Sequence, residues 1–243
     1  MLNFAHRGFS GKYPENTMLA FRKAVEAGAD GIELDVHLSK DGEIVIMHDE
    51  RVNRTTDGEG FIADYTYDEL LNFDASADFM GEYGVNRIPT LREYFEFIKP
   101  IDGFLTNIEL KTDRNEYPGI EAKTAALIAE FDLADRIIIS GFNHYSVLRF
   151  KKIMPEVKCG FLYDCRMAMA GEYAESRGVE CMHPKHTGLT EENVPEIKSH
   201  GIEINAWTVN TSEDVSRLYS LGITSVIGNY PDMAKETIES LMK

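Results

Sequence analysis

The sequence predicts an α/β fold in which eight strand–helix units close into a (β/α)8 TIM barrel. Apolar strand-like runs alternate with helix-like segments along the 243 residues, as in parallel sheets whose crossovers are helices. The length suits one large α/β domain or two small ones, and a hydrophobic content of 43% is enough for a proper core. A doubly wound open sheet is the alternative, but the first turn, His6-Arg7-Gly8-Phe9-Ser10-Gly11, lacks its glycine spacing.

The chain begins with a short buried strand over 2–6 and a helix over roughly 16–27, for which Gly28 is the stop. The central strand follows over 31–37. Asp41-Gly42 predicts a turn into a second apolar run over 43–48. A hairpin about Lys40-Asp41 would place position 48 opposite position 33.

Residues 49–90 differ in texture from the rest of the chain. They are rich in Asp, Gly, Thr and Asn, with single aromatic residues, and we interpret them as an inserted lobe with one short helix near 68–71. Long loops in compact enzymes are usually functional. Too few aliphatic residues are present for a separate core, so we expect a single domain over 1–243 that contains this lobe.

The remainder has a regular rhythm. Thr90-Leu91-Arg92-Glu93 has the pattern of a capping box and opens a helix that ends at Pro100. Pro118 is expected in the first turn of the next helix. The predicted strands are 104–110, 136–140, 158–163, 180–183, 202–207 and 223–227. The predicted helices are 118–131, 144–153, 167–176, 190–199, 211–221 and a last one from Pro231.

The charge excludes several classes of partner. With 25 basic and 41 acidic residues the net charge is −16, which argues against nucleic acid and against docking on an anionic membrane. No apolar run approaches the roughly 20 residues of a transmembrane helix. A small anionic substrate is allowed if local cations hold it. We therefore expect no nucleic-acid partner and no stable membrane association, and the sequence leaves a homo-oligomer open.

The cysteines and the N-terminus predict a cytoplasmic protein. Cys159, Cys165 and Cys181 are odd in number and have no CxxC spacing, which is typical of free thiols in a reducing compartment. We expect all three to be packing residues. The first residues contain neither a basic segment nor a long apolar one, so we expect no signal peptide.

Acidic side chains gather at the ends of two predicted strands. In the central strand Glu33 and Asp35 share the face opposite Ile32 and Leu34, because side chains alternate along a strand. If the apolar residues pack outward on helices, Glu33, Asp35 and Glu109 point into the mouth of the barrel. Clustered carboxylates repel each other and need a cation. A hard divalent cation, Ca²⁺ or Mg²⁺, prefers such oxygen ligands, and no cluster of His or Cys favours zinc.

Imidazoles and cations would surround this acidic cluster. His6 and His48 would flank the metal, and imidazole is well suited to proton transfer near neutral pH. Arg7 and Lys111 are cations in an acidic chain, which indicates an anion such as phosphate. The alternative for Lys111 is a plain ion pair with Glu109. Trp207 either stacks on a substrate or only fills the barrel mouth. Two further histidines, His37 and His183, could line the cavity, and His200 is expected on a helix surface.

Several motifs resemble one family. They are Ala5-His6-Arg7-Gly8, Pro14-Glu15-Asn16-Thr17, Glu33-Leu34-Asp35-Val36, His48-Asp49, Arg54-Thr55-Thr56-Asp57-Gly58, Ile108-Glu109-Leu110-Lys111 and Trp207-Thr208-Val209-Asn210. In combination they resemble the bacterial cytosolic glycerophosphodiester phosphodiesterases, among the phospholipase C-like phosphodiesterase barrels, from residue 3 to about 232. The last strand end, Gly228-Asn229-Tyr230-Pro231-Asp232, departs from the family, whose members more often have a Thr-Asn or Thr-Asp pair before the proline.

The resemblance implies a fold, a site and a reaction. It implies an irregular (β/α)8 barrel with a small inserted lobe and one Ca²⁺ or Mg²⁺ ion on Glu33, Asp35 and Glu109. It implies His6 and His48 as acid and base, and Arg7 and Lys111 as the phosphate ligands. The implied reaction hydrolyses a glycerophosphodiester to sn-glycerol 3-phosphate and an alcohol, either by direct attack of water or through a cyclic phosphate.

Two other functions stay open from the sequence. A related barrel phospholipase of the C or D type would act on a lysophospholipid or a phosphoinositide and would need a larger apolar rim. A protein that binds phosphodiesters without turnover would retain the pocket, although the full set of His6, His48 and three acids disfavours it.

Overall fold

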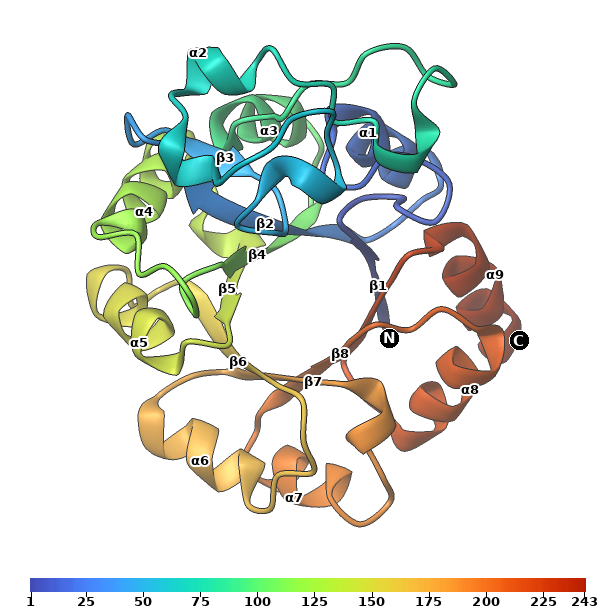
Figure 1. Ribbon diagram of the computed structural model, residues 1–243. Coiled ribbons are helices and arrows are strands. Elements are labelled where there is room, and N and C mark those ends of the chain that lie inside the picture. Colours follow the sequence, from blue (N-terminus) through green and yellow to red (C-terminus); the bar gives the residue numbers. More distant parts are fainter.

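The computed structural model describes residues 1–243 and confirms the (β/α)8 barrel. Its strands are β1 (Leu2–His6), β2 (Gly31–Leu38), β3 (Ile44–Ile46), β4 (Leu105–Leu110), β5 (Ile137–Gly141), β6 (Lys158–Tyr163), β7 (Cys181–Pro184), β8 (Glu203–Ala206) and β9 (Ser225–Gly228). Eight of them pair in parallel, and β1 pairs with both β2 and β9, which closes the ring seen in Figure 1. Only β3 lies outside the ring, antiparallel to β2.

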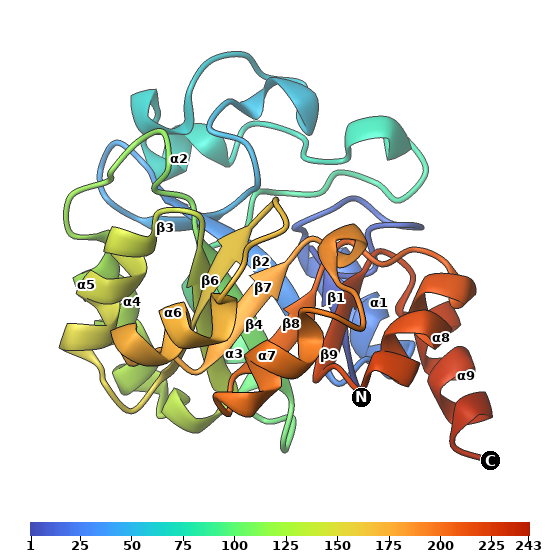
Figure 2. The ribbon, with the colours of Figure 1, turned by 90° about the horizontal axis from the view of Figure 1, so that it is seen from below.

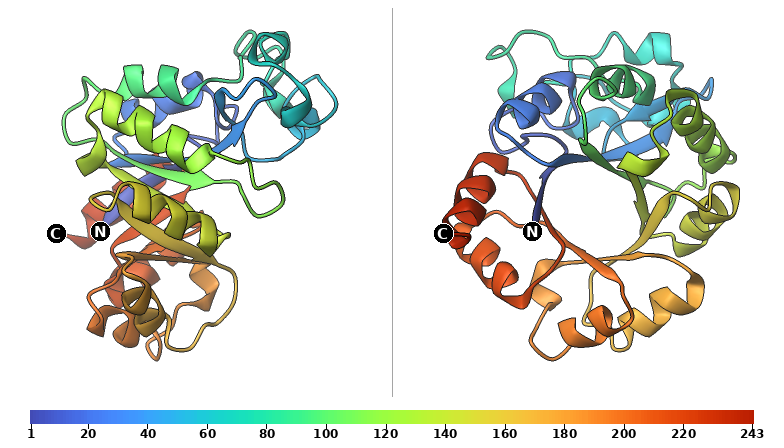
Figure 3. Two further views of the ribbon diagram at one scale, coloured as in Figure 1. Left: turned by 90° about the vertical axis from the view of Figure 1, so that its left-hand side faces the viewer. Right: turned by 180° about the vertical axis from the view of Figure 1, so that it is seen from behind.

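Eight helices surround the barrel and a ninth lies in the lobe (Figures 1 and 3). The helices are α1 (Met18–Glu26), α2 (Tyr67–Leu70), α3 (Leu91–Ile98), α4 (Ile120–Phe131), α5 (His144–Ile153), α6 (Ala170–Arg177), α7 (Val194–Ser199), α8 (Ser212–Leu221) and α9 (Pro231–Leu241). The predicted capping box at Thr90 and Glu93 is formed at the start of α3. No helix combines the length and the hydrophobicity that crossing a lipid bilayer requires.

The outward faces of the strands form the main core with the helices. Ile32 and Leu34 of β2 and Ile108 of β4 are fully buried there, together with residues of the surrounding helices such as Phe21 and Phe95. Because side chains alternate along a strand, the residues between the apolar ones face the barrel interior. The core thus fixes which side chains of β2 and β4 point inward, as the alternation predicted.

The predicted register of the hairpin is wrong by one residue. β2 and β3 pair Val36 with Ile46 and Leu38 with Ile44, and the ladder does not extend to position 48. Ser39 donates its N–H to the Glu43 carbonyl oxygen, and Gly42 adopts a φ of +82° inside this turn. The turn therefore has three residues between its closing pair, a common hairpin with a left-handed glycine, where the sequence suggested two.

The lobe over 49–90 lies over one end of the barrel (Figure 2), the end at which β2 leads into β3. It has a small apolar cluster, and two members, Val45 and Met47, come from the hairpin arm and the residue that follows it. Val52, Ile62 and Leu70 supply much of the rest. We infer that the lobe depends on the arm for its core and is part of one domain over 1–243.

Some smaller predictions need correction. Pro118 precedes α4, whose N-cap is Gly119, so it is outside the first turn. α6 and α7 begin three and four residues later than predicted, at Ala170 and Val194. Cys159 and Cys181 are buried as expected, but Cys165 is exposed and is not a packing residue. All three thiols are free, and the cytoplasmic location stays a prediction.

Candidate active site

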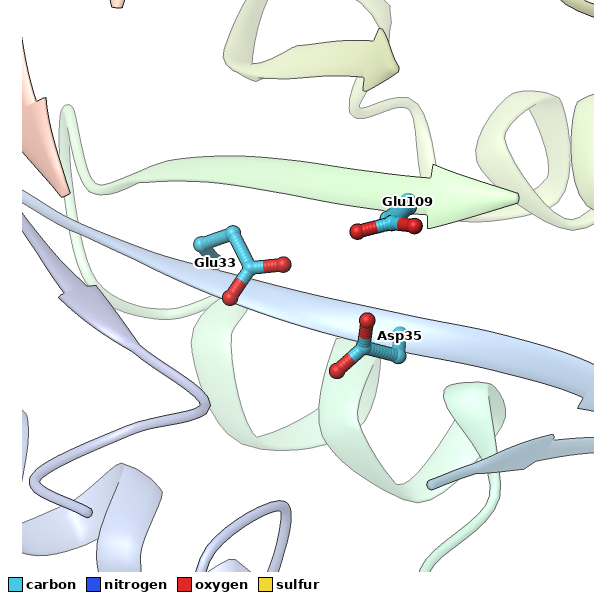
Figure 4. Close-up of side chains that lie close together, drawn as sticks. All are labelled: Glu33, Asp35 and Glu109. Carbon is cyan, nitrogen blue, oxygen red and sulfur yellow. The ribbon is translucent and has the colours of Figure 1, made fainter. Parts of the chain in front are cut away.

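Three carboxylates converge inside the mouth of the barrel. β2 supplies Glu33 and Asp35, and β4 supplies Glu109, which pairs in register with Asp35 across the two strands. One oxygen from each lies within 4.8 Å of the others, and all three residues are buried. Figure 4 shows the three side chains pointing toward one another between the two strands. The alternation of β2 and β4 is what brings the group together.

The charges in this group are not balanced by hydrogen bonds alone. Burial and the charges of Asp35 and Glu109 raise the pKa of Glu33 well above its usual value. Burial also raises the pKa of Glu109, although Lys111 opposes this. The Oδ1 atom of Asp35 is buried and accepts no hydrogen bond. Three carboxylates offer hard oxygen ligands, and one of their buried oxygens has no hydrogen bond. This set fits a divalent cation such as Ca²⁺ or Mg²⁺.

Two cations border the carboxylates. Arg7 follows β1 with a positive φ of 55°. Its backbone N–H donates to both the carbonyl oxygen and the Oε2 oxygen of Glu33. Its Nε lies 3.5 Å from Asp35 Oδ2. Lys111 Nζ donates to Glu109 Oε1 at 2.8 Å, so the ion pair considered from the sequence exists beside the acidic cluster. Burial opposes ionisation of Asp35, but the charges of His48, Arg7 and Lys111 keep its pKa below the usual value.

His6 stands beside Glu33 with an uncharged partner. Its Nδ1 lies 2.7 Å from Asn229 Oδ1, so Nδ1 carries the proton and Nε2 faces Glu33 Oε2 at 3.9 Å. Burial lowers the pKa of His6 to about 3, and the charge of Arg7 adds to this. The imidazole is therefore neutral near pH 7, with Nε2 able to accept a proton. Tyr230, where the chain departs from the family, lies with its ring against Gly11.

His48 has an ionised partner. Its Nδ1 donates to Asp49 Oδ1 at 2.6 Å, and its Nε2 lies 3.3 Å from Lys111 Nζ. The hydrogen bond from His48 is the main reason that the pKa of Asp49 is lowered. The carboxylate at Nδ1 orients this ring, and the ammonium of Lys111, which can only donate, faces Nε2. The two imidazoles thus have different electrostatic environments.

Two adjoining cavities open at this end of the barrel. The inner one, of about 80 Å³, is lined by His6, Glu33 and Glu109, and by Trp207 on its apolar side. The outer one, of about 530 Å³, lies between the lobe and the loop after β4. His48 and Phe142 border both. Trp207 donates its indole N–H to the His183 carbonyl at 2.7 Å, which fixes its ring at the wall of the inner cavity.

All eight residues proposed from the sequence lie at this site, whereas the other histidines do not border the two cavities. His37 is fully buried and contacts the hydroxyl of Tyr117 and the carbonyl of His48. His183 is buried in the barrel interior beside Asn205. His200 lies at the end of α7 next to Glu175, as expected for a surface position.

Sequence reasoning missed the residues that orient the site. Asn229 binds His6, and Asn16 donates its amide to Asp35 Oδ2 at 2.9 Å. Asp49 binds His48, while Glu15 and Arg54 bind each other and their neighbours. An acidic residue directly after His48 is a signal that could have identified Asp49. No local pattern links Glu15 to Arg54.

Comparison with known proteins identifies the family. The model of the glycerophosphoryl diester phosphodiesterase family matches residues 6–233. The chain belongs to this family. A glycerophosphodiester phosphodiesterase of Caldanaerobacter subterraneus is 44% identical over 231 residues, 95% of each chain. One of Bacillus altitudinis is 40% identical over 240 residues, 98% of each chain.

A solved structure adds a bound molecule to this family relationship. The structure of an Oleispira antarctica phosphodiesterase in complex with the product sn-glycerol-3-phosphate superposes with a TM-score of 0.87 at 31% identity. The match covers 98% of this chain and 97% of that one. The resemblance inferred from the motifs is therefore confirmed at the level of the family and of the fold.

Proposed function

We propose that this protein hydrolyses glycerophosphodiesters to sn-glycerol 3-phosphate and an alcohol. The observation that carries the proposal is a buried group of three carboxylates with an imidazole on either side, at the mouth of a barrel of this family. The names of the relatives and the product bound to the Oleispira antarctica protein support the same reaction.

We infer that Glu33, Asp35 and Glu109 hold one divalent cation, Ca²⁺ or Mg²⁺. The orphaned Oδ1 of Asp35 and the raised pKa of Glu33 support this assignment, because a bound cation would satisfy the first and stabilise the ionised form of the second. When bound, the ion would neutralise negative charge that develops on the phosphoryl oxygens. Arg7 and Lys111 border the carboxylates and would bind the same phosphate.

The partners of the two imidazoles indicate their roles. His6 is neutral with a free Nε2, which suits a base that takes a proton from the nucleophile, the 2-hydroxyl of glycerol or a water. We assign His48 as the acid: with a second proton on Nε2 its ring would give that proton to the departing alcohol oxygen, and the Asp49 carboxylate at Nδ1 would balance the charge of the ring. The oxygen–phosphorus bond to the nucleophile forms as the bond to the alcohol breaks. If the 2-hydroxyl attacks, water then opens the cyclic phosphate.

The two cavities suggest how the substrate lies. The glycerol would occupy the inner cavity against Trp207, with the phosphate toward Arg7 and the carboxylates. The alcohol would leave past His48 into the outer cavity, where Phe61 and Phe142 are the two hydrophobic residues among ten that line it. A polar wall of this kind favours a small polar alcohol over the acyl chain of a lysophospholipid.

A release assay tests the proposal. The purified protein is expected to release sn-glycerol 3-phosphate from glycerophosphocholine or glycerophosphoethanolamine, and a chelator of divalent cations is expected to stop the release. Adding back Ca²⁺ or Mg²⁺ separately shows which ion serves. Binding of these diesters without product at any metal concentration would contradict the proposal and would favour a binding protein.

A further inference from the structure

Two segments of the sequence supply none of the groups that contact the substrate or transfer a proton in the reaction proposed above. They are Pro14-Glu15-Asn16-Thr17, after β1, and Arg54-Thr55-Thr56-Asp57-Gly58, in the lobe. Glu15 and Arg54 lie 39 residues apart in sequence, yet their side chains meet. Arg54 Nη1 donates to Glu15 Oε2 at 3.0 Å and Arg54 Nη2 to Glu15 Oε1 at 2.8 Å. This is the paired, planar geometry that makes arginine–carboxylate contacts specific.

Each member of this pair also binds a residue at the candidate active site. Arg7 Nη1 donates to Glu15 Oε1 at 2.9 Å. On the other side Arg54 Nε donates to Asp49 Oδ2 at 2.7 Å, and Arg54 Nη2 to Asp49 Oδ1 at 3.1 Å. Asp49 in turn accepts from His48. A continuous chain of charged contacts therefore runs from Arg7 through Glu15, Arg54 and Asp49 to His48.

The surroundings of Glu15 and Arg54 favour the charged forms of both side chains. The Glu15 side chain is 18% exposed, and although burial opposes ionisation, its bonds to Arg54 and Arg7 lower its pKa below the usual value. Arg54 sits between two carboxylates and shares its guanidinium with both. It reaches from the lobe to the loop after β1, so it connects the segment that holds Arg7 to the segment that holds His48.

We propose that Arg54 is a positioning residue that keeps Arg7 and His48 in register on either side of the phosphate. This inference rests on the proposed function, because it explains how two groups are held for that reaction. Without Arg54, Glu15 would be paired with Arg7 alone and would draw the Arg7 guanidinium away from the phosphate. Asp49 would lose two donors, and the imidazole of His48 would be held less firmly.

The kinetics of three single variants separate effects on Arg7 from effects on His48, the two ends of this series of contacts. We expect Arg54→Gln to lower kcat and raise KM together, with a loss in kcat/KM of about 10- to 100-fold, as for other residues that orient a reacting group. Asp49→Asn is expected to lower mainly kcat, and Glu15→Gln to raise mainly KM. The double variant Arg54→Gln/Asp49→Asn is expected to have a kcat no lower than the worse single variant, because both act through His48.

Two controls guard against a change in folding. Arg87→Gln removes another exposed arginine of the lobe, whose bond is to the Phe73 carbonyl, and is expected to keep the activity of the wild type. Arg54→Lys keeps the charge but offers one nitrogen, so it is expected to fall between wild type and Arg54→Gln. The proton between His48 Nδ1 and Asp49 gives a spectroscopic readout, a low-field ¹H resonance that should shift in Arg54→Gln and persist in Arg87→Gln.

The outcomes distinguish this inference from the proposed function. An active wild type together with an Arg54→Gln variant of unchanged kcat, KM and His48 resonance would overturn the positioning role alone. Losses that multiply in the double variant would overturn it as well. A wild type that releases no sn-glycerol 3-phosphate would overturn the proposed function, while a shifted His48 resonance in Arg54→Gln would still support the coupling.

Discussion

Replacing His48 with alanine is expected to lower kcat for sn-glycerol 3-phosphate release by at least about 10²- to 10⁴-fold, the usual share of an acid–base group. The imidazole lies between the two cavities with its Nε2 near Lys111, where the departing alcohol would pass. Alanine removes the imidazole that is expected to give a proton to the departing alcohol oxygen. The measurement is kcat at saturating substrate, with the metal held constant, so that binding of the ion does not limit the rate.

The choice of substrate sharpens this experiment. If His48 is the acid, an alcohol that leaves readily without a proton, such as p-nitrophenol, should recover much of the rate in His48→Ala. The same substrate should not rescue His6→Ala, because His6 is expected to activate the nucleophile. A His48→Ala protein with near-normal kcat on glycerophosphocholine would contradict the assignment. His200→Ala is the matched control, since His200 binds Glu175 and Glu196 at the end of α7 and is remote from the reaction.

The convergence of the three carboxylates of the proposed metal site could be predicted from sequence because their placement follows from local rules. Glu33 and Asp35 alternate with Ile32 and Leu34, so burying the apolar face sends both carboxylates inward. Glu109 follows the same rule on the neighbouring strand. Parallel pairing then brings Asp35 opposite Glu109. Each step depends on the alternation of side chains along a strand and on the order of the strands, and both can be inferred from the pattern of apolar residues.

The series of contacts that links Arg7 to His48 through Arg54 could not be predicted in this way. Glu15 and Arg54 lie in irregular segments, and their contact depends on how the lobe folds back over the barrel. The hairpin shows the same limit on a small scale. One left-handed residue, Gly42, added a position to the turn and shifted the register that the dipeptide Asp41-Gly42 suggested. Periodicity predicts faces, whereas turn geometry and long-range ion pairs depend on three-dimensional packing.

Removing the divalent cation is expected to abolish turnover and to give the folded protein an unusual dependence on pH. In the metal-free protein burial raises the pKa of Glu33 and of Glu109 above their usual value. At these two carboxyls the folded state then binds more protons than the unfolded state above about pH 4.5, so their contribution to the free energy of unfolding falls as the pH rises toward the folded pKa values. Asp35, with a lowered pKa, acts in the opposite sense only below about pH 4. Burial also lowers the pKa values of His6, His37 and His183 to about 3, 4 and 3, so these neutral imidazoles make the stability rise with pH up to about pH 6.5. The contribution of the two carboxyls is therefore measured as the difference between the wild type and Glu33→Gln.

The cation should reverse this loss. Binding at 100 times Kd adds about 2.7 kcal/mol to the free energy of unfolding. For a chain of this size each kcal/mol raises Tm by roughly 2–4 °C. Tm is measured from pH 5 to 8 with chelator, with Ca²⁺ and with Mg²⁺. Glu33→Gln removes one of the repelling charges, so its metal-free Tm should fall less with pH than that of the wild type, and it should respond less to the ion.

Glu191→Gln, at an exposed position before α7, is the matched control for the loss of one carboxylate and should follow the wild type at every pH. A metal-free wild type whose Tm changes from pH 5 to 8 in the same way as that of Glu33→Gln would contradict the repulsion among the three acids, because the buried histidines contribute equally to both proteins. A Tm that neither ion changes would contradict the metal site itself, because a cation held by Glu33, Asp35 and Glu109 must stabilise the only state in which these carboxylates meet.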